Sequence, residues 1–525
     1  MGKDSSGRHA LLVAAGILCS RLMGLVRQRV FSHFFGLSDI ADAFSSALRV
    51  PNFLQNLFGE GVLSASFIPV YARLLAQGKQ KEADQVAGAV AAALALGISL
   101  IVVAGILATP WLIWAIAPGY VGEKRELTIL LVRILFPGTG LLVGSAWCLG
   151  ILNSHRRFFL SYSAPVIWNL AMIVTMVVFR HSSLPDLAVW LAWGTTLGCL
   201  LQVAIQLPPV LKLTGTLPLR PDGSNANVRE VFRNFGAVVI SRGIVQISSY
   251  VDQAISTLLG AGAMAAMTTA ASISMLPVSL FGMAISASEL PAMARSLGND
   301  DSPDATAALR LRLNRGMRRI AFFVVPSAMA FFVLGDVITA ALYQSGRFTH
   351  DDAVFVWAIL AGSGVGLLAS TLGRLYSSTY YALLDPRTPL RYALVRLVLT
   401  IGLGLICALY LPPLLGIAPQ WGTVGLTASA GVAGWIELFL LRRTLNGRIG
   451  ATGLPRSLLY TLWGAAAASA AAAFGIKIAL GWQQPILLGI VVLGVYGCLY
   501  FAMTYIAKVE ECRTFVQGFA RRLKR

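Results

Sequence analysis

The stretch LFGEGVLSASFIPVYARLL, residues 57–75, returns in shortened form as LFGMAISASELPAMARSL, residues 280–297. Within the two copies, SASFIPVYARLL (64–75) and SASELPAMARSL (286–297) are identical at seven of twelve positions, and the identities include serine, proline and arginine. Chance similarity between apolar stretches would not reproduce these polar and proline positions in order. We therefore interpret the two copies as an internal repeat with a period of about 222 residues.

The composition around this repeat is that of a membrane protein. The 525 residues are 56% hydrophobic and 12% charged, whereas soluble domains carry about 25% charged residues. Apolar runs of about 20 residues cross a bilayer as helices, while a barrel would show short alternating segments. We predict an all-α polytopic protein with about fourteen transmembrane helices. The predicted spans are residues 10–35, 40–72, 86–109, 127–152, 160–180, 186–208, 234–260, 264–294, 318–344, 352–383, 391–411, 421–441, 457–480 and 485–507.

The distribution of positive charge predicts the orientation of these spans. The net charge is +19, but most lysines and arginines outside the spans lie on one set of alternate loops and near both termini. The opposite loops hold Lys124, Arg125, Arg180 and Arg347. Cytoplasmic loops are enriched in Lys and Arg, so both termini are expected in the cytoplasm. This alternation follows membrane topology, and we expect no nucleic-acid partner.

The two repeat copies are separated by six predicted spans, so they have the same orientation. This predicts two parallel six-helix lobes followed by two further helices, an arrangement typical of transporters that work by alternating access around a central polar site. The predicted parts are a first lobe with spans 1–6, a cytoplasmic linker, a second lobe with spans 7–12, and a last pair of spans with a basic tail: residues 1–211, 212–233, 234–446 and 447–525. The arginine-rich segment 295–319 is expected to lie along the membrane surface.

The first predicted span contains Arg21, Arg27 and Arg29. An ionisable side chain at bilayer depth costs about 3 kcal/mol, so it faces protein or water. Arg29 is expected to reach towards the interface. Arg21 and Arg27 lie about 120° apart on a regular helix, so they converge only if the helix bends near Gly24. We expect these two to line a polar cavity, with pairing to carboxylates of the second span as the alternative.

The second predicted span carries a polar stripe. At about 100° per residue, Asp42, Arg49, Asn56 and Glu60 fall on one face, and Pro51 is expected to bend the helix. Arginine presents a rigid fork of donors that matches phosphate. Several arginines with a few carboxylates therefore favour a bulky anionic ligand, whereas a multidrug exporter of organic cations would need the opposite balance.

Several polar motifs resemble those of the MurJ (MviN) family. They are SRLMGLVRQRVFSHFFG (20–36), APGY (117–120), ILNSHRRF (151–158), LYQSGRFT (342–349) and YYALLDPRTP (380–389). The resemblance implies a member of the MOP exporter superfamily, with fourteen helices in two lobes and a lipid groove along the last two. It also implies a flippase for lipid II, the undecaprenyl-pyrophosphate-linked precursor of peptidoglycan, in the bacterial inner membrane. The implied partners are lipid II, membrane lipids and the cell-wall synthesis machinery, with a role in cell shape.

The family's functional residues match this sequence in part. Arg21, Arg27, Asp42 and Glu60 match, but the paired arginines that many members carry in the second span are replaced here. Their positions hold Gln55 and Asn56, and the arginine of the eighth span aligns with Ser272. We expect Arg49 and Arg242 to supply positive charge in their place. The alternative is a different substrate, another lipid-linked oligosaccharide.

The energy source stays open between Na⁺, H⁺ and the membrane potential. Some family members use a carboxylate of the seventh span and polar groups of the eleventh as a sodium site. Asp252 matches the carboxylate, but the eleventh span offers Arg396, which is not a cation ligand. We therefore expect an internal pair between Asp252 and Arg396.

Other classes of function fit the sequence less well. The five histidines show no metal-ligand spacing such as H-E-x-x-H, and no nucleotide-binding lysine motif is present. We expect a transporter with no catalytic residue, metal or cofactor. A non-transporting membrane scaffold is the alternative from another class, and it would give the polar stripe of the second span no role.

Overall fold

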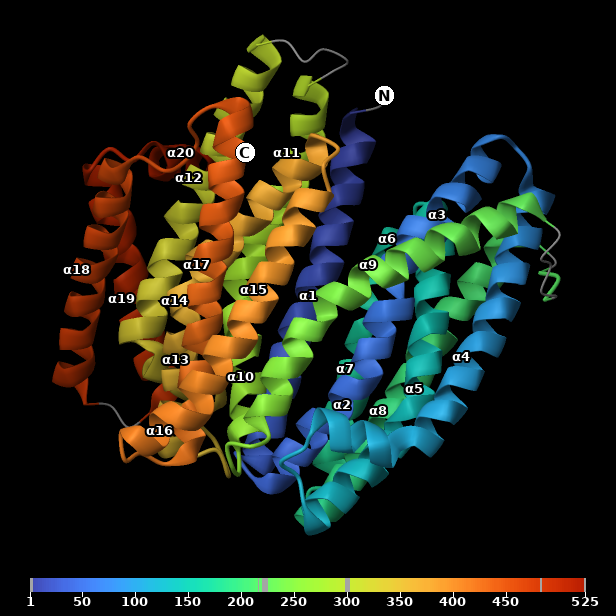
Figure 1. The fold of residues 1–525 in the computed structure, drawn as a ribbon, viewed down its shortest axis with the longest axis horizontal. Helices are drawn as coiled ribbons and strands as arrows, with labels where there is room; N and C mark the ends of the chain where they lie inside the picture. The colour runs from blue at the N-terminus through green and yellow to red at the C-terminus, as the bar shows by residue number, and fades with distance from the viewer. Residues whose placement is uncertain (1–2, 216, 220–224, 298–302, 482–483, 524–525) are drawn as a thin grey trace. The chain divides into compact units, whose positions relative to one another are not determined.

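A computed structural model describes residues 3–215, 217–219, 225–297, 303–481 and 484–523 (Figure 1). Within these ranges the regular elements are helices and no β-strand forms, which confirms the predicted all-α class. Contacts between Cα atoms divide the chain into two compact units, Met1–Ala265 (unit 1) and Ala266–Arg525 (unit 2). Helix α9 (Ala226–Ser256) contacts α2, α3 and α4, so it falls within unit 1. The predicted lobe boundary at residue 234 rests on the repeat and stays a prediction.

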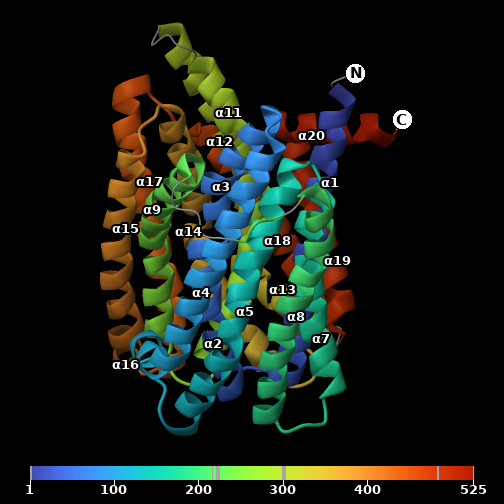
Figure 2. The same cartoon turned by 90° about the vertical axis from the view of Figure 1, so that its right-hand side faces the viewer.

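In its described residues, unit 1 is built from nine helices and the first residues of a tenth. They are α1 (Lys3–Phe35), α2 (Asp39–Phe58), α3 (Glu60–Ala76), α4 (Gln80–Ile116), α5 (Gly122–Ser154), α6 (Phe158–Ser163), α7 (Pro165–Val178), α8 (Leu184–Leu213), α9 (Ala226–Ser256) and the start of α10 (Ala263–Pro277). Helix α5 packs against α2, α4 and α8, and Figure 2 shows α4, α5 and α8 running alongside one another. Helix α5 is therefore the central support for α2, the helix of the predicted polar stripe.

Unit 2 continues from α10 through a π-helical turn, Val278–Met283, into α11. Its further helices are α11 (Ala284–Leu297), α12 (Pro303–Val333), α13 (Gly335–Tyr343), α14 (His350–Ala382), α15 (Arg387–Leu405), the π-helical turn Ile406–Tyr410, α16 (Leu411–Leu414), the short 3₁₀ turn Pro419–Trp421, α17 (Gly422–Ile449), α18 (Arg456–Leu480), α19 (Pro485–Ile506) and α20 (Glu510–Leu523). Helices α14 and α17 form the largest interface within this unit, and α15 packs against α17.

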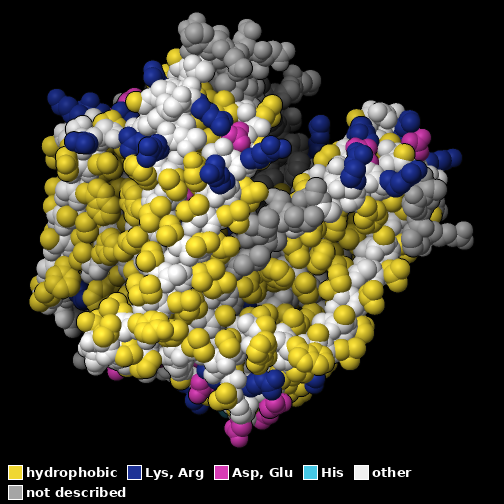
Figure 3. All heavy atoms as spheres, in the orientation of Figure 1, with side chains coloured by type: hydrophobic (Ala, Val, Ile, Leu, Met, Phe, Trp, Pro, Cys, Tyr) yellow, Lys and Arg dark blue, Asp and Glu magenta, His cyan; other side chains and the backbone are white. Residues whose placement is uncertain are grey.

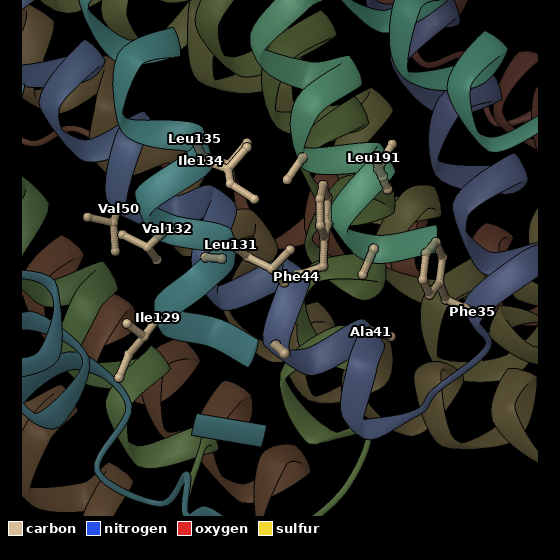
Figure 4. Packing of buried hydrophobic residues seen from close by; sticks show 14 of the residues in the cluster. Phe35, Ala41, Phe44, Val50, Ile129, Leu131, Val132, Ile134, Leu135 and Leu191 are labelled. Atoms are coloured by element: carbon tan, nitrogen blue, oxygen red, sulfur yellow. The ribbon is translucent and has the colours of Figure 1, made fainter. Parts of the chain in front are cut away.

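A hydrophobic core fixes α2 within unit 1. Figure 4 shows Phe44 of α2 beside Leu131 of α5, and Val50 of α2 beside Val132 of α5, among the buried side chains of this cluster. Phe31 of α1 joins it, with its ring centroid 5.5 Å from that of Phe44. Burying one such side chain contributes about 1.5–3 kcal/mol, so the first half of α2 is held firmly in place.

Both repeat copies leave α-helical geometry at their shared LFG motif. In the first copy the predicted span 40–72 is interrupted at Gly59, whose N–H donates to the carbonyl of Gln55 at 2.7 Å. A Cβ at Gly59 would lie 2.3 Å from that oxygen, so the interruption needs glycine. In the second copy the motif, residues 280–282, lies within the π-helical turn Val278–Met283. The shared irregularity agrees with an internal repeat.

The membrane-crossing potential of the helices agrees with most of the predicted spans. Eleven helical segments in the described part of the chain are long and apolar enough to cross a bilayer. The remaining three predicted spans correspond to α1, to α2 with α3, and to α9, and each of these carries arginine. The count of fourteen stays a prediction.

Residues 303–319 of the predicted arginine-rich surface segment do not form an element of their own. Helix α12 begins at Pro303 and continues without a break to Val333, so residues 303–319 are the first half of a long, partly apolar helix. In unit 2 taken by itself, Figure 3 shows Lys and Arg side chains gathered at one end and hydrophobic side chains along the helices. The sequence pattern identified the charge but not the helix continuing beyond it.

Two glycines allow α14 and α17 to approach closely, and their replacement gives a first prediction. A Cβ at Gly366 would lie 2.4 Å from the Cα of Gly431, whereas a Cβ at Gly373 on the same helix would meet no atom within 4 Å. We expect Gly366→Ala to lower the free energy of unfolding by about 1–3 kcal/mol, the usual cost of overpacking. Thermal unfolding of the purified protein measures this, with Gly373→Ala as the matched control. Equal stability of the two variants would contradict the packing.

Candidate functional site

Arg27 of α1 is fixed against α7. Its guanidinium carbon lies 5.5 Å from the ring centroid of Trp168, and its Nη1 lies 3.8 Å from the Sδ of Met172. A cation over an indole ring gains about 0.5–1 kcal/mol or more. The indole and the thioether therefore hold the guanidinium beside α7, and a guanidinium presents the planar fork of donors that matches a forked anion.

Arg21 lies on the same helix but is exposed, whereas Arg27 is partly buried. Helix α1 runs unbroken through Gly24, and a Cβ at that glycine would meet no atom within 4 Å. Space beside Gly24 is therefore open, but the helix shows no interruption there. That Arg21 and Arg27 act on one ligand stays a prediction.

Asp42 of α2 is the most completely enclosed of the candidate residues, with a relative exposure of 0%. Its Oδ2 accepts hydrogen bonds from the backbone N–H of Gly262 and from Nζ of Lys124, each at 2.8 Å, and its Oδ1 accepts from the N–H of Ala265, also at 2.8 Å. Gly262 directly precedes α10 and Ala265 lies in its first turn, where the helix dipole favours a negative charge. Asp42 therefore connects α2, α5 and the first turn of α10.

Lys124 extends this network towards the surface. Besides Asp42, its ammonium group binds Asp39 at 2.7 Å and lies 4.3 Å from the ring centroid of Tyr120. The hydroxyl of Tyr120 is hydrogen-bonded to Ser46 of α2 at 2.8 Å. This set, Asp39, Asp42, Lys124, Tyr120 and Ser46, is called the Asp42 network below. A buried carboxylate with a cation and two N–H donors is well compensated.

Arg49 joins α2 to α9 within unit 1. Its Nη1 donates to Oε1 of Gln253 at 3.4 Å, and its carbonyl accepts from the hydroxyl of Tyr250 at 3.0 Å. The ring of Tyr250 also packs edge-on against Phe53, with centroids 4.7 Å apart. The structure therefore places Arg49 against α9, the helix that carries Asp252.

The other predicted residues of α2 and α3 differ in their surroundings. Gln55 is partly buried and its carbonyl accepts from Gly59, whereas Asn56 is exposed. Glu60 opens α3, but its side chain lies outside the described residues. The described part of the predicted stripe thus runs from a buried, hydrogen-bonded Asp42 to the exposed Asn56, so these members do not share one environment.

The predicted residues of α9 to α15 are also placed in part. Arg242 lies on α9, and its side chain is outside the described residues. Ser272 of α10 bonds the hydroxyl of Tyr343 at 2.9 Å and donates to the carbonyl of Thr269 at 2.6 Å. Arg396 was expected to pair with Asp252, but its Nη1 lies 3.1 Å from Oε2 of Glu437 on α17. Glu437, on the adjacent α17, is therefore a partner of Arg396, and the pair with Asp252 stays a prediction.

An ion pair outside the spans ties the end of the first repeat copy to α9. Nη2 of Arg73 lies 2.7 Å from Oε2 of Glu230, and the same group donates to Asn227 at 3.3 Å. These hydrogen bonds from Arg73 hold the pKa of Glu230 below its usual range. Both side chains are solvent-accessible, so the pair positions α9 and adds little to stability.

Sequence reasoning missed three residues of this region. Lys124, Trp168 and Tyr250 supply the partners of Asp42, Arg27 and Arg49, from helices distant in sequence. Only Lys124 had a signal, because it closely follows the APGY motif. Among the described residues, no group of three or more His, Cys, Asp or Glu side chains is placed to hold a metal ion.

Comparison with known sequences gives a consistent result. The family model described as "Lipid II flippase MurJ" matches residues 31–496. A protein of Burkholderia cenocepacia named "Lipid II flippase MurJ" is 30% identical over 449 residues, which cover 84% of each chain. A "Probable lipid II flippase MurJ" of Rhizobium tropici is 30% identical over 447 residues, or 83% of this chain and 80% of that one.

Solved structures agree on the fold. One titled "Lipid II flippase MurJ, inward closed conformation" aligns with a TM-score of 0.76 and 20% identity over 98% of this chain and 100% of its own. An inward-facing multidrug resistance MATE family transporter of the MOP superfamily aligns with a TM-score of 0.68 and 17% identity, over 84% of this chain and 98% of its own. These structural matches show that the chain shares the fold of these two proteins.

Proposed function

Because the chain belongs to the MurJ family of lipid II flippases, we propose that it moves lipid II from the cytoplasmic to the periplasmic leaflet of the bacterial inner membrane. The observation that carries this proposal is the family match over residues 31–496, which runs from the end of α1 into α19. The family and the transporter fold confirm the prediction of a transporter of the MOP superfamily. The protein then serves peptidoglycan biosynthesis.

Arg27 is proposed as an anion clamp for the pyrophosphate of lipid II. A guanidinium donates paired hydrogen bonds to phosphate oxygens, and the contact with Trp168 holds that of Arg27 beside α7. Arg21, at the exposed face of α1, is proposed to meet the same head group as it enters. The polyprenyl tail is proposed to stay in lipid along α18 and α19, which are apolar enough to cross the membrane.

The Asp42 network is proposed to hold unit 1 closed at the end where Asp39 and Lys124 lie. By the positive-inside pattern this end faces the periplasm, since Lys124 and Asp39 lie opposite the basic loops. The network fastens the first turn of α10 to α2 and α5 with three bonds to one carboxylate. In alternating access, these bonds would hold during uptake and part during release.

The energy source and wider partners are further parts of the proposal. Arg396 of α15 is paired with Glu437. Because this arginine neutralises the carboxylate, Glu437 does not need a bound Na⁺ or H⁺ for that purpose. Transport measured with imposed Na⁺, H⁺ or electrical gradients separates the three drives. Both termini are proposed to be cytoplasmic, with the cell-wall synthesis machinery as a partner.

Substrate choice is tested by direct binding. Purified protein in nanodiscs is expected to bind lipid II more tightly than an undecaprenyl-pyrophosphate-linked oligosaccharide without the peptide. Arg27→Gln is expected to weaken binding of both, because they share the pyrophosphate. Preference for the peptide-free lipid would instead support the alternative substrate class, another lipid-linked oligosaccharide.

A further inference from the structure

Unit 2 contains a group of charged side chains to which the proposed clamp assigns no role. Arg374 lies on α14, Arg396 on α15 and Glu437 on α17, three helices that pack against one another. Arg396 and Glu437 form an ion pair at 3.1 Å. Arg374 lies close enough to both for their charges to act on it. This group is called the Arg374 cluster below.

The cluster lies at membrane depth. Arg374 is eight residues before the end of α14, and Arg396 is nine residues after the start of α15. At 1.5 Å per residue these positions are about 12 Å and 14 Å inside the helix ends. All three helices are apolar enough to cross a bilayer. A charge at this depth is costly in lipid, so it faces protein or water.

The charges of the cluster do not balance. Glu437 neutralises one guanidinium, and Arg374 forms no hydrogen bond or ion pair with any other described residue. Its side chain is exposed, and a Cβ at the adjacent Gly373 would meet no atom within 4 Å. Two arginines and one carboxylate beside open space leave a net positive charge. Such a site lacks an anion rather than a cation.

We infer that the Arg374 cluster is a second oxyanion subsite, which binds a phosphate or carboxylate group of the lipid-linked substrate during its passage. This inference rests on the proposed function. Arg374 is the direct ligand, and Arg396 adds positive charge that Glu437 moderates. Moderation suits a transporter, because a transit site must bind weakly enough to release. Each unit would then contribute an arginine at membrane depth, Arg27 in unit 1 and Arg374 in unit 2.

The binding experiment uses the full chain in nanodiscs of zwitterionic lipid. Arg374→Gln is expected to raise the Kd for lipid II about 10- to 100-fold, because it removes a hydrogen-bonded charge. Arg374→Lys should recover part of the affinity, since it keeps the charge. Arg391→Gln is the matched control, because Arg391 is an exposed arginine near the start of α15. If the wild type binds lipid II and a folded Arg374→Gln variant binds it with the same affinity, the second subsite is contradicted, while the proposed function is not affected.

Glu437→Gln tests whether the Arg374 cluster binds an anion or a cation. An oxyanion subsite predicts tighter binding of lipid II and of inorganic pyrophosphate, because Arg396 loses its carboxylate. A cation site predicts the reverse, with a loss of any Na⁺ dependence, and that result would overturn the inference. Nanodiscs containing phosphatidylglycerol identify the other source of phosphate: full competition by this lipid would assign the site to bilayer phospholipid and contradict a substrate role. Absence of lipid II binding by the folded wild type would instead remove the proposed function on which the inference rests.

Discussion

Replacing Asp42 with alanine is expected to lower the free energy of unfolding by about 3–5 kcal/mol, the usual cost of removing one partner from a buried ion pair. The substitution leaves the ammonium of Lys124 without its buried carboxylate and removes the acceptor for the N–H groups of Gly262 and Ala265. Lipid II transport should fall to background, because the first turn of α10 is no longer fastened to α2. Thermal unfolding and a translocation assay on the same preparation measure both effects.

The double variant Asp42→Asn with Lys124→Met separates the ion pair from the helix cap. Asparagine can still accept from one N–H at the start of α10, and removing the lysine charge avoids a mostly buried ammonium whose remaining partner is the exposed Asp39. We expect the double variant to be more stable than Asp42→Asn alone. Equal unfolding temperatures of the two variants would show that the contact between Asp42 and Lys124 does not stabilise the protein.

Arg27→Gln is expected to reduce lipid II translocation by about 100-fold with little loss of stability. A charge-assisted hydrogen bond contributes about 1.5–3 kcal/mol, which corresponds to between about 10- and 200-fold in binding. The contact with Trp168 contributes about 0.5–1 kcal/mol to stability. Arg27→Lys should also be impaired, because lysine offers no planar fork of donors. Initial rates in proteoliposomes at matched protein content provide the measurement.

Arg180→Gln is the control for this experiment, since Arg180 is exposed in the loop after α7 and donates to His181. It should transport as the wild type does. Wild-type rates from a folded Arg27→Gln protein would show that Arg27 is not part of the anion clamp. A large fall in the melting temperature of Arg27→Gln would show that the contact between Arg27 and Trp168 mainly stabilises the fold.

The sequence predicted the helices well because their signal is local. Apolar runs of membrane length recur along the chain, and eleven of the predicted spans correspond to helical segments that are long and apolar enough to cross. The repeat was equally visible, and both copies depart from α-helical geometry at their LFG motif. A glycine such as Gly59 marks such an interruption because its neighbour, the carbonyl of Gln55, leaves no room for a Cβ.

The partners of the charged residues could not be predicted, because they lie on helices distant in sequence. Asp42 and Lys124 are 82 positions apart, and Lys124 appeared to be a loop charge. Arg396 pairs with Glu437 across α15 and α17, a contact that depends on how those helices pack. Periodicity places a residue on one face of its own helix, but it does not identify the helix that meets this face.

The helix boundaries were missed for a different reason. The first half of α12 carries many arginines, so composition alone suggested a surface segment. A helix that leaves the membrane continues as long as its backbone bonds are satisfied, whatever the polarity of its side chains. The change from polar to apolar sequence at about residue 320 marks a change of solvent, not the end of a helix.

The most direct test of the central claim is translocation of fluorescent lipid II by the purified wild-type protein in proteoliposomes. Lipid II is placed in both leaflets, and the fraction that becomes accessible to an external quencher is followed with time, against liposomes without protein. We predict quenching beyond the outer-leaflet fraction with wild type and not with Arg27→Gln. A folded wild-type protein that leaves the inner-leaflet lipid II protected under Na⁺, H⁺ and electrical gradients would contradict a lipid II flippase.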